Sequence, residues 1–166
     1  MFKRFEDLTL KLAIWREKHI TEKNLILILS LIIGIGAACA KKFAQAGYDL
    51  VLNARSEDKL RPLLEELTQN SIQVCPLIFD VRDRKAAQQA IDSLPEKFKA
   101  IDVLVNNAGL ALGMDKEYEG IEENYDTMID TNITALLMIT RMVVPGMVER
   151  GRGHIINIGS VAGDAA

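Results

Sequence analysis

Short apolar runs alternate with longer amphipathic runs along most of the chain, and this alternation constrains the fold more than any other feature of the sequence. The short runs predict strands at residues 25–29, 49–54, 72–79, 101–106 and 154–158. The longer runs predict helices at residues 36–46, 56–69, 85–94 and 121–143. Strands that alternate with helices form βαβ units, whose right-handed crossovers give a parallel sheet with helices on both faces. The sequence therefore predicts a doubly wound α/β domain of about five strands.

Local signals mark several of the predicted helix ends. Gly47 follows the first helix, and Ser56 stands where an N-cap serine would begin the second. Pro145 and Gly146 follow the long apolar pattern that starts near Ile121, and a proline disrupts a helix interior. We therefore expect the last helix to end before Pro145.

The composition fits one globular domain and excludes several other classes of protein. With 166 residues, 49% of them hydrophobic and 26% charged, the chain can bury a core, and neither disorder nor a coiled coil is expected. The net charge of −3, without a basic stripe, argues against a nucleic-acid partner. Cys39 and Cys75 lie in apolar stretches without metal-ligand spacing. We expect reduced core thiols, no metal and a cytoplasmic location, with a redox or metal role as the alternative.

The N-terminal region has two interpretations. Residues 1–23 predict a helical extension, with apolar side chains at helical spacing that would dock on the domain, or on a membrane surface or partner. Residues 25–40 carry no charge, so a membrane anchor is the alternative to a first strand. A membrane span needs about 20 apolar residues, and Gly34 and Gly36 interrupt this run. We therefore expect residues 24–166 to form the domain, without a membrane span.

Glycines follow the first predicted strand, at the point where a doubly wound sheet binds its ligand. The turn begins at Ser30 and continues through Gly34, Ile35 and Gly36 directly into a helix. Such a turn lets backbone approach a pyrophosphate and directs the amides of the helix N-terminus at it. The alternative is a tight strand-to-helix turn without a ligand.

Polar residues follow the next three predicted strands. Arg55 stands where nucleotide-binding folds place the residue that contacts the ribose, and an arginine there suits a 2′-phosphate, although a solvated charge is the alternative. Asp80 follows the third strand and would either cap a turn or face the adenine. Asn106 ends the fourth strand and Asn107 follows it, and adjacent amides at this place need backbone or ligand partners.

The stretch from Gly34 to about Gly163 resembles the short-chain dehydrogenase/reductase family. The resemblance is carried by motifs in the same order and spacing, namely Asp80-Val81, Asn106-Asn107-Ala108-Gly109, Asp130-Thr131-Asn132 and Ile155-Ile156-Asn157-Ile158-Gly159-Ser160. The sequences of residues 107–113, 128–132, 145–150 and 153–160 are similar to those of bacterial and yeast NADP-dependent 3-hydroxy acid dehydrogenases, which act on serine, allo-threonine and related acids. The resemblance implies a partial Rossmann domain, NADP as cofactor, a small 3-hydroxy acid or alcohol as substrate, and a homo-oligomer for the full-length family.

The resemblance also implies a role for each matching residue. Ser160 would hydrogen-bond the substrate oxygen where charge develops, with a strand-end cap as the alternative. Asn132 would support a proton-relay water, with a satisfied core asparagine on the apolar face of Tyr125 and Ile129 as the alternative. The remaining matches would line the cofactor; they are Ser30, Gly34, Ile35, Gly36, Arg55, Asp80, Val81, Asn107, Ala108 and Gly109.

The glycine turn departs from the family pattern Thr-Gly-x-x-x-Gly-x-Gly. Leu29 and Ser30 replace the threonine and the first glycine, and Ile32 and Ile33 replace small polar residues. If the first glycine position requires a left-handed backbone, a serine there costs about 1–2 kcal/mol. Branched apolar side chains beside a pyrophosphate would also crowd it, so we expect weakened cofactor binding.

The family's Tyr-x-x-x-Lys motif does not occur in these 166 residues. In the family that tyrosine is the acid/base group, and loss of such a group costs about 10²–10⁴ in rate. We therefore expect a chain of this length to be an inactive nucleotide-binding half of a dehydrogenase. The alternatives are a non-catalytic nucleotide-binding or interaction protein and a membrane-anchored protein. The last predicted strand would form an apolar sheet edge, which predicts marginal stability, aggregation or a partner.

Overall fold

The computed structural model describes residues 25–30, 34–113 and 116–160. The predicted helical extension at residues 1–23, and the predicted crowding by Ile32 and Ile33, lie outside the described residues.

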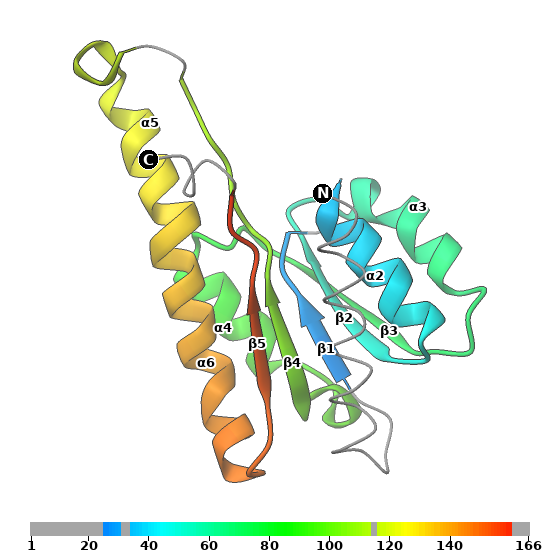
Figure 1. Cartoon of the computed structure of the whole chain (residues 1–166). Coiled ribbons are helices and arrows are strands. Elements are labelled where there is room, and N and C mark those ends of the chain that lie inside the picture. The colour runs from blue at the N-terminus through cyan, green and yellow to red at the C-terminus, as the bar shows by residue number, and fades with distance from the viewer. Residues whose placement is uncertain (1–24, 31–33, 114–115, 161–166) are drawn as a thin grey trace.

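Five parallel strands form one sheet in the order β3-β2-β1-β4-β5 (Figure 1). Their bounds are β1 Leu25–Ile28, β2 Asp49–Ala54, β3 Val74–Ile78, β4 Ile101–Asn106 and β5 His154–Asn157. In the register, Leu27 of the central strand pairs with Val51 on one side and Leu104 on the other. The strand order reverses between β1 and β4, which is where doubly wound sheets bind their ligands. The predicted Rossmann-type sheet is confirmed.

Helices cover both faces of the sheet (Figure 1). α2 (Ile35–Gln45) and α3 (Glu57–Leu67) pack on one face, and α4 (Arg84–Asp92) and α6 (Ala135–Glu149) pack on the other. Because side chains alternate along a strand, Ile26 and Ile28 of β1 point to the core beneath α2, whereas Leu25 and Leu27 point to the core beneath α6. This double burial explains why β1 is apolar at every position.

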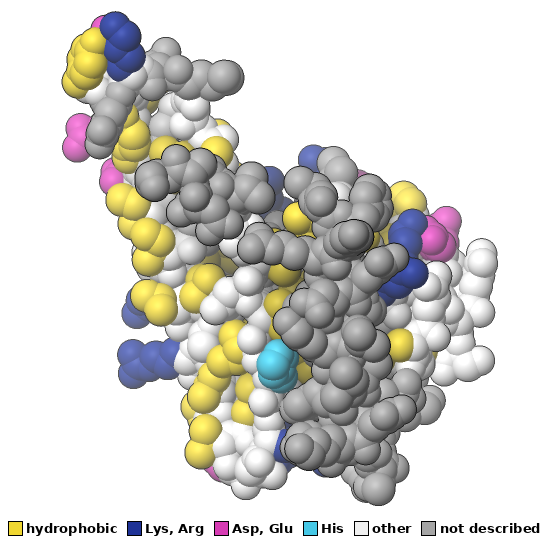
Figure 2. Space-filling view, viewed as in Figure 1, with side chains coloured by type: hydrophobic (Ala, Val, Ile, Leu, Met, Phe, Trp, Pro, Cys, Tyr) yellow, Lys and Arg dark blue, Asp and Glu magenta, His cyan; other side chains and the backbone are white. Residues whose placement is uncertain are grey.

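One long helix runs along the second face of the sheet. It consists of α5 (Glu122–Ile129), a π-helical segment η3 (Asp130–Thr134) and α6. Two short 3₁₀ turns, η1 (Glu96–Phe98) and η2 (Glu117–Glu119), precede β4 and α5 respectively. Figure 2 shows hydrophobic side chains along the outer side of the long helix, where Ile129, Ile133 and Leu137 are more than half exposed.

The predicted end of the long helix before Pro145 is wrong. α6 continues through Pro145 to Glu149, because Val143 and Met147 on either side of the proline are both buried in the core. This packing outweighs the one hydrogen bond that proline cannot donate. Gly151 lies two residues after the end of α6, has a left-handed φ of 65°, and donates its N–H to the carbonyl of Val148 in the last turn at 3.0 Å. A glycine that follows a helix is the stop signal here.

The uncharged stretch from residue 25 to residue 40 is not one apolar helix. Its first residues form β1, the central strand, and its last residues belong to α2. Among the described residues, the helix Glu122–Glu149 is long and apolar enough to cross a membrane by length and composition, with 33% of its most apolar window buried inside the protein. The core helix of a soluble protein passes the same test, so this result identifies no membrane segment.

Both cysteines are free thiols. Cys39 is buried on α2, and burial raises the pKa of its thiol to about 11. Cys75 is half-buried in β3, where burial raises the pKa of its thiol and the charge of Lys97 acts in the opposite direction. Burial therefore favours the neutral form of both thiols, and both cysteines are reduced in the structure.

Candidate functional site

The turn after β1 starts at Ser30, which has a left-handed backbone with φ of 55°. Its N–H donates to the side-chain oxygen of Asn53 at 3.2 Å, and its carbonyl accepts from the side-chain nitrogen of Asn107 at 2.9 Å. Neighbouring segments on both sides of β1 therefore hold this residue. The conditional expectation that a serine replaces a left-handed glycine is confirmed.

Asn53 is a buried polar residue that the sequence interpretation missed. It lies in β2 and is 1% exposed. Its side-chain nitrogen donates to the carbonyls of Leu77 at 3.3 Å and Phe79 at 3.0 Å, at the end of β3. Asn53 therefore links three consecutive strands at the carboxyl edge of the sheet. The available signal was a single amide in an otherwise apolar strand, since a buried amide needs partners.

Gly36 lies where the first turn of α2 approaches the segment after β4. A Cβ at this position would be 2.6 Å from the side-chain nitrogen of Asn107 and 3.2 Å from the carbonyl oxygen of Ser30. Gly34 has a φ of 77° and precedes α2 as its N-cap, with open space where a Cβ would be. Gly34 is exposed and Gly36 is buried, so Gly34 leaves backbone at the surface, which suits a pyrophosphate, whereas Gly36 allows the close contact with Asn107.

The carboxyl end of β4 is fixed by Asn106. Its side-chain nitrogen donates to the side-chain oxygen of Asn157 in β5 at 2.8 Å and to the hydroxyl of Thr140 in α6 at 3.1 Å. Beyond it, Ala108 packs against the core beneath α6, and Gly109 is exposed. The two adjacent asparagines therefore have different partners: Asn106 connects the sheet to α6, and Asn107 hydrogen-bonds to the turn after β1.

Asn132 holds the loop after β4 in place. Its side-chain oxygen accepts from the N–H of Leu110 at 2.9 Å, and its side-chain nitrogen donates to the carbonyl of the same residue at 2.8 Å. Asn132 is exposed, and Ile129 is 51% exposed, so the structure argues against the alternative of a core asparagine. The π-helical segment changes the phase of the helix at this point, and such segments are frequent at functional sites.

Charged side chains gather beyond the ends of β2 and β3. Arg55 is exposed directly after β2. The carboxylate of Asp80 accepts from the guanidinium of Arg82 at 2.7 Å (Nη2 to Oδ2) and 3.1 Å (Nε to Oδ1), and from the Arg82 backbone N–H at 3.0 Å. The Arg82 hydrogen bond holds the pKa of Asp80 below its ordinary value. The predicted turn cap is therefore present, and Val81 beside it is a buried core residue.

Ser160 lies three residues beyond β5 and is exposed. The structure thus brings Ser30, Gly36 and Asn107 into direct contact, and a separate contact joins Asn132 to the loop after β4. The described residues contain no group of three metal-ligating side chains.

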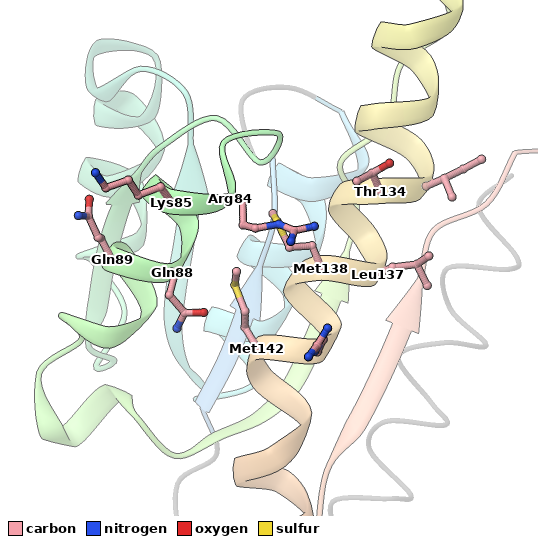
Figure 3. Close-up of a pocket in the computed structure, with 10 residues that line it drawn as sticks. Arg84, Lys85, Gln88, Gln89, Thr134, Leu137, Met138 and Met142 are labelled. Atoms are coloured by element: carbon pink, nitrogen blue, oxygen red, sulfur yellow. The ribbon is translucent and has the colours of Figure 1, made fainter.

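A groove of about 850 Å³ lies between α4 and the long helix, and its lining includes Ile133 and Thr134, which directly follow Asn132 (Figure 3). Arg84 extends from α4 toward Met138 of α6, and Met142 points toward α4 from the same helix. This groove includes none of the residues that the sequence assigns to a cofactor.

Glycine turn, strand order and the residues at the strand ends together define a dinucleotide-binding α/β fold. Residues 24–166 match the family model of the short chain dehydrogenases, and the chain belongs to this family. It is 45% identical over 139 residues to the NADP-dependent 3-hydroxy acid dehydrogenase YdfG of Salmonella typhi, which covers 84% of this chain and 55% of that relative. It is also 45% identical over 141 residues to sulfoacetaldehyde reductase 2 of Chromohalobacter salexigens, covering 84% of this chain and 56% of the relative.

Solved structures give the same family. The serine dehydrogenase of Escherichia coli superimposes with a TM-score of 0.78 at 42% identity, over 86% of this chain and 64% of that chain. A serine dehydrogenase complexed with NADP+ superimposes with a TM-score of 0.77 at 43% identity, over 84% of this chain and 55% of that chain. The chain therefore spans about half the length of the curated relatives it matches.

Proposed function

We propose that these residues form the NADP-binding half of an oxidoreductase that acts on the hydroxyl group of a small 3-hydroxy acid or a related alcohol or carbonyl compound. The relatives named above are an NADP-dependent 3-hydroxy acid dehydrogenase and a sulfoacetaldehyde reductase, and one solved relative is complexed with NADP+. These names support both the cofactor and the substrate class.

The observation that carries the proposal is the contact between Gly36, Asn107 and Ser30. A Cβ on Gly36 would be 2.6 Å from the Asn107 side-chain nitrogen, so only glycine lets these two segments approach. The result is a surface of backbone at the N-terminus of α2, and backbone amides at a helix N-terminus suit a pyrophosphate. The described residues therefore fit a dinucleotide.

The charged residues favour NADP over NAD. Arg55 is exposed beside the end of β3, and a guanidinium binds a phosphate group with a rigid fork of donors. We assign the 2′-phosphate to Arg55 and the adenine to the side of Asp80 and Val81. When bound, the nicotinamide would supply the hydride acceptor or donor of the reaction.

The substrate end of the site is assigned to Ser160 and Asn132. Ser160 would donate a hydrogen bond to the substrate oxygen, and Asn132 would support proton transfer while it holds the loop at Leu110. No tyrosine in these 166 residues is followed by a lysine four positions later. We therefore expect residues 1–166 by themselves to bind cofactor without oxidising a 3-hydroxy acid.

We also propose that the full-length protein is cytoplasmic and assembles into homo-oligomers. The long helix exposes Ile129, Ile133 and Leu137 on its outer side, and a row of exposed apolar side chains suits a subunit contact.

The test is isothermal titration calorimetry, in which the protein is titrated separately with NADPH and with NADH. We expect NADPH to bind at least tenfold more tightly than NADH, and Arg55→Ala to remove most of that difference. Lys99→Ala is the matched control, because Lys99 also carries an exposed positive charge but precedes β4 at the opposite end of the sheet. The absence of NADPH binding by the folded protein would overturn the proposal.

A separate assay tests the catalytic expectation. The protein of residues 1–166 is mixed with serine and NADP+, and the formation of NADPH is measured by its absorbance. We expect no turnover above background, and a rate typical of an enzyme would contradict that expectation.

A further inference from the structure

Arg82 is a charged residue that the cofactor assignment above leaves without a role. It lies in the turn after β3, and its guanidinium grips the carboxylate of Asp80 through Nε at 3.1 Å and Nη2 at 2.7 Å. Its backbone N–H donates to the same carboxylate at 3.0 Å. The side chains of both residues are about one third exposed, at 39% and 30%, so the pair stands at the surface of the site.

The pair lies beside the residue assigned to the 2′-phosphate. Ala54, immediately before Arg55, pairs with Ile78, and its carbonyl accepts from the N–H of Phe79 at 3.0 Å. Arg55 and Asp80 therefore follow directly from two strand ends that are hydrogen-bonded to each other. Consistent with this, the charge of Arg55 lowers the pKa of Asp80.

This arrangement creates an electrostatic conflict for a phosphate at Arg55. A dianionic group placed there would face the negative charge of Asp80, and like charges on one binding surface weaken binding. Asp130, at the start of the π-helical segment, adds a second negative charge whose field reaches Arg82. Without Arg82, Arg55 would face the carboxylate of Asp80 with its charge not neutralised.

We propose that Arg82 is a specificity-determining positioning residue, which neutralises Asp80 so that the surface beside Arg55 accepts a 2′-phosphate. The inference rests on the proposed NADP site and names the residue that sets its preference for a phosphorylated ribose. Arg82 acts through Asp80, because its donors are directed at that carboxylate. A cofactor without the 2′-phosphate carries no charge at this position, so its affinity should not depend on Arg82.

The ratio of the dissociation constants for NADH and NADPH is the readout that separates this role from a structural one. Loss of a structural contact would weaken both cofactors and leave the ratio unchanged. We expect Arg82→Ala to weaken NADPH binding about tenfold, which corresponds to about 1.4 kcal/mol, and to change NADH binding less than twofold. Arg82→Gln, which keeps the length of the side chain without its charge, should give the same ratio.

A double variant tests the mechanism. If Arg82 acts by neutralising Asp80, then Asp80→Asn combined with Arg82→Ala removes both charges and should restore the ratio to within about threefold of the wild-type value. Any contact of Asp80 with the adenine affects NADPH and NADH alike, so it cancels in the ratio. Lys99→Ala serves again as the control for loss of an exposed, ion-paired cation.

The outcomes are distinguishable. If the wild-type protein binds no NADPH, the proposed function is overturned, and this inference with it. If the wild-type protein prefers NADPH but Arg82→Ala and Arg82→Gln leave the ratio unchanged, only the role of Arg82 is overturned. The role of Arg82 is also overturned if the double variant has a ratio as low as that of Arg82→Ala.

Discussion

Replacing Ser30 with glycine should stabilise the protein. Ser30 has a φ of 55°, and a left-handed backbone costs a residue other than glycine about 1–2 kcal/mol. A glycine raises the entropy of the unfolded chain, which offsets about 0.4–1 kcal/mol of that gain. Both hydrogen bonds of Ser30, to Asn53 and from Asn107, use backbone atoms that glycine keeps. We therefore expect Ser30→Gly to raise the free energy of unfolding by about 0.5–1 kcal/mol.

Urea denaturation followed by circular dichroism measures this change, and a thermal melt should show an increase of about 1–4 °C in Tm. Ser56→Gly is the matched control, because Ser56 has an ordinary extended backbone with φ of −142° and its side chain makes no capping hydrogen bond. That substitution should leave the stability unchanged or lower it. If Ser30→Gly lowers the stability as Ser56→Gly does, the reasoning from backbone strain is refuted.

Three further predictions concern the other parts of the site and the core. Gly36→Ala should destabilise the protein by about 1–3 kcal/mol in urea denaturation, because its Cβ would press on the Asn107 amide; an unchanged midpoint would contradict the close contact. Asn132→Ala should speed hydrogen exchange at the Leu110 amide about fivefold or more. Equal exchange rates in the wild type and the variant would refute the claim that Asn132 holds this loop. Cys39, whose folded-state pKa is raised to about 11 from 9.0, favours folding while its thiol is neutral. Stability should therefore fall as the pH rises from about 9 toward 11, less so in Cys39→Ala, and identical pH profiles would contradict this.

The fold was predictable because burial and periodicity agree along the chain. β1 is apolar at every position since it is buried on both faces, and the amphipathic helices alternate with it in the order that a parallel sheet needs. The position of the glycine turn was predictable, whereas a left-handed backbone at Ser30 was only a condition drawn from the family pattern, which the structure meets. These features depend on local sequence.

The missed features depend on contacts between distant segments. Asn53 and Arg82 were not singled out, because an amide or a guanidinium shows its importance only when its partners are known. The long helix contains a π-helical segment that no local pattern marked, and Asn132 lies exposed within it. The helix end near Pro145 was misplaced because tertiary burial of Met147 outweighs the local preference of proline.

The hydrogen bonds around Ser30 make the conformation of the turn depend on the alignment of several strands. Asn53 connects Ser30 to the edge strand β3, and Asn107 connects it to the segment after β4, so the turn is complete only when β1 to β4 are all aligned. A dinucleotide that binds this turn would therefore favour the assembled sheet as a whole over any partly opened form. In such a complex, opening of the edge strand β3 and release of the nucleotide would be coupled, so the bound ligand would add to the stability of β3.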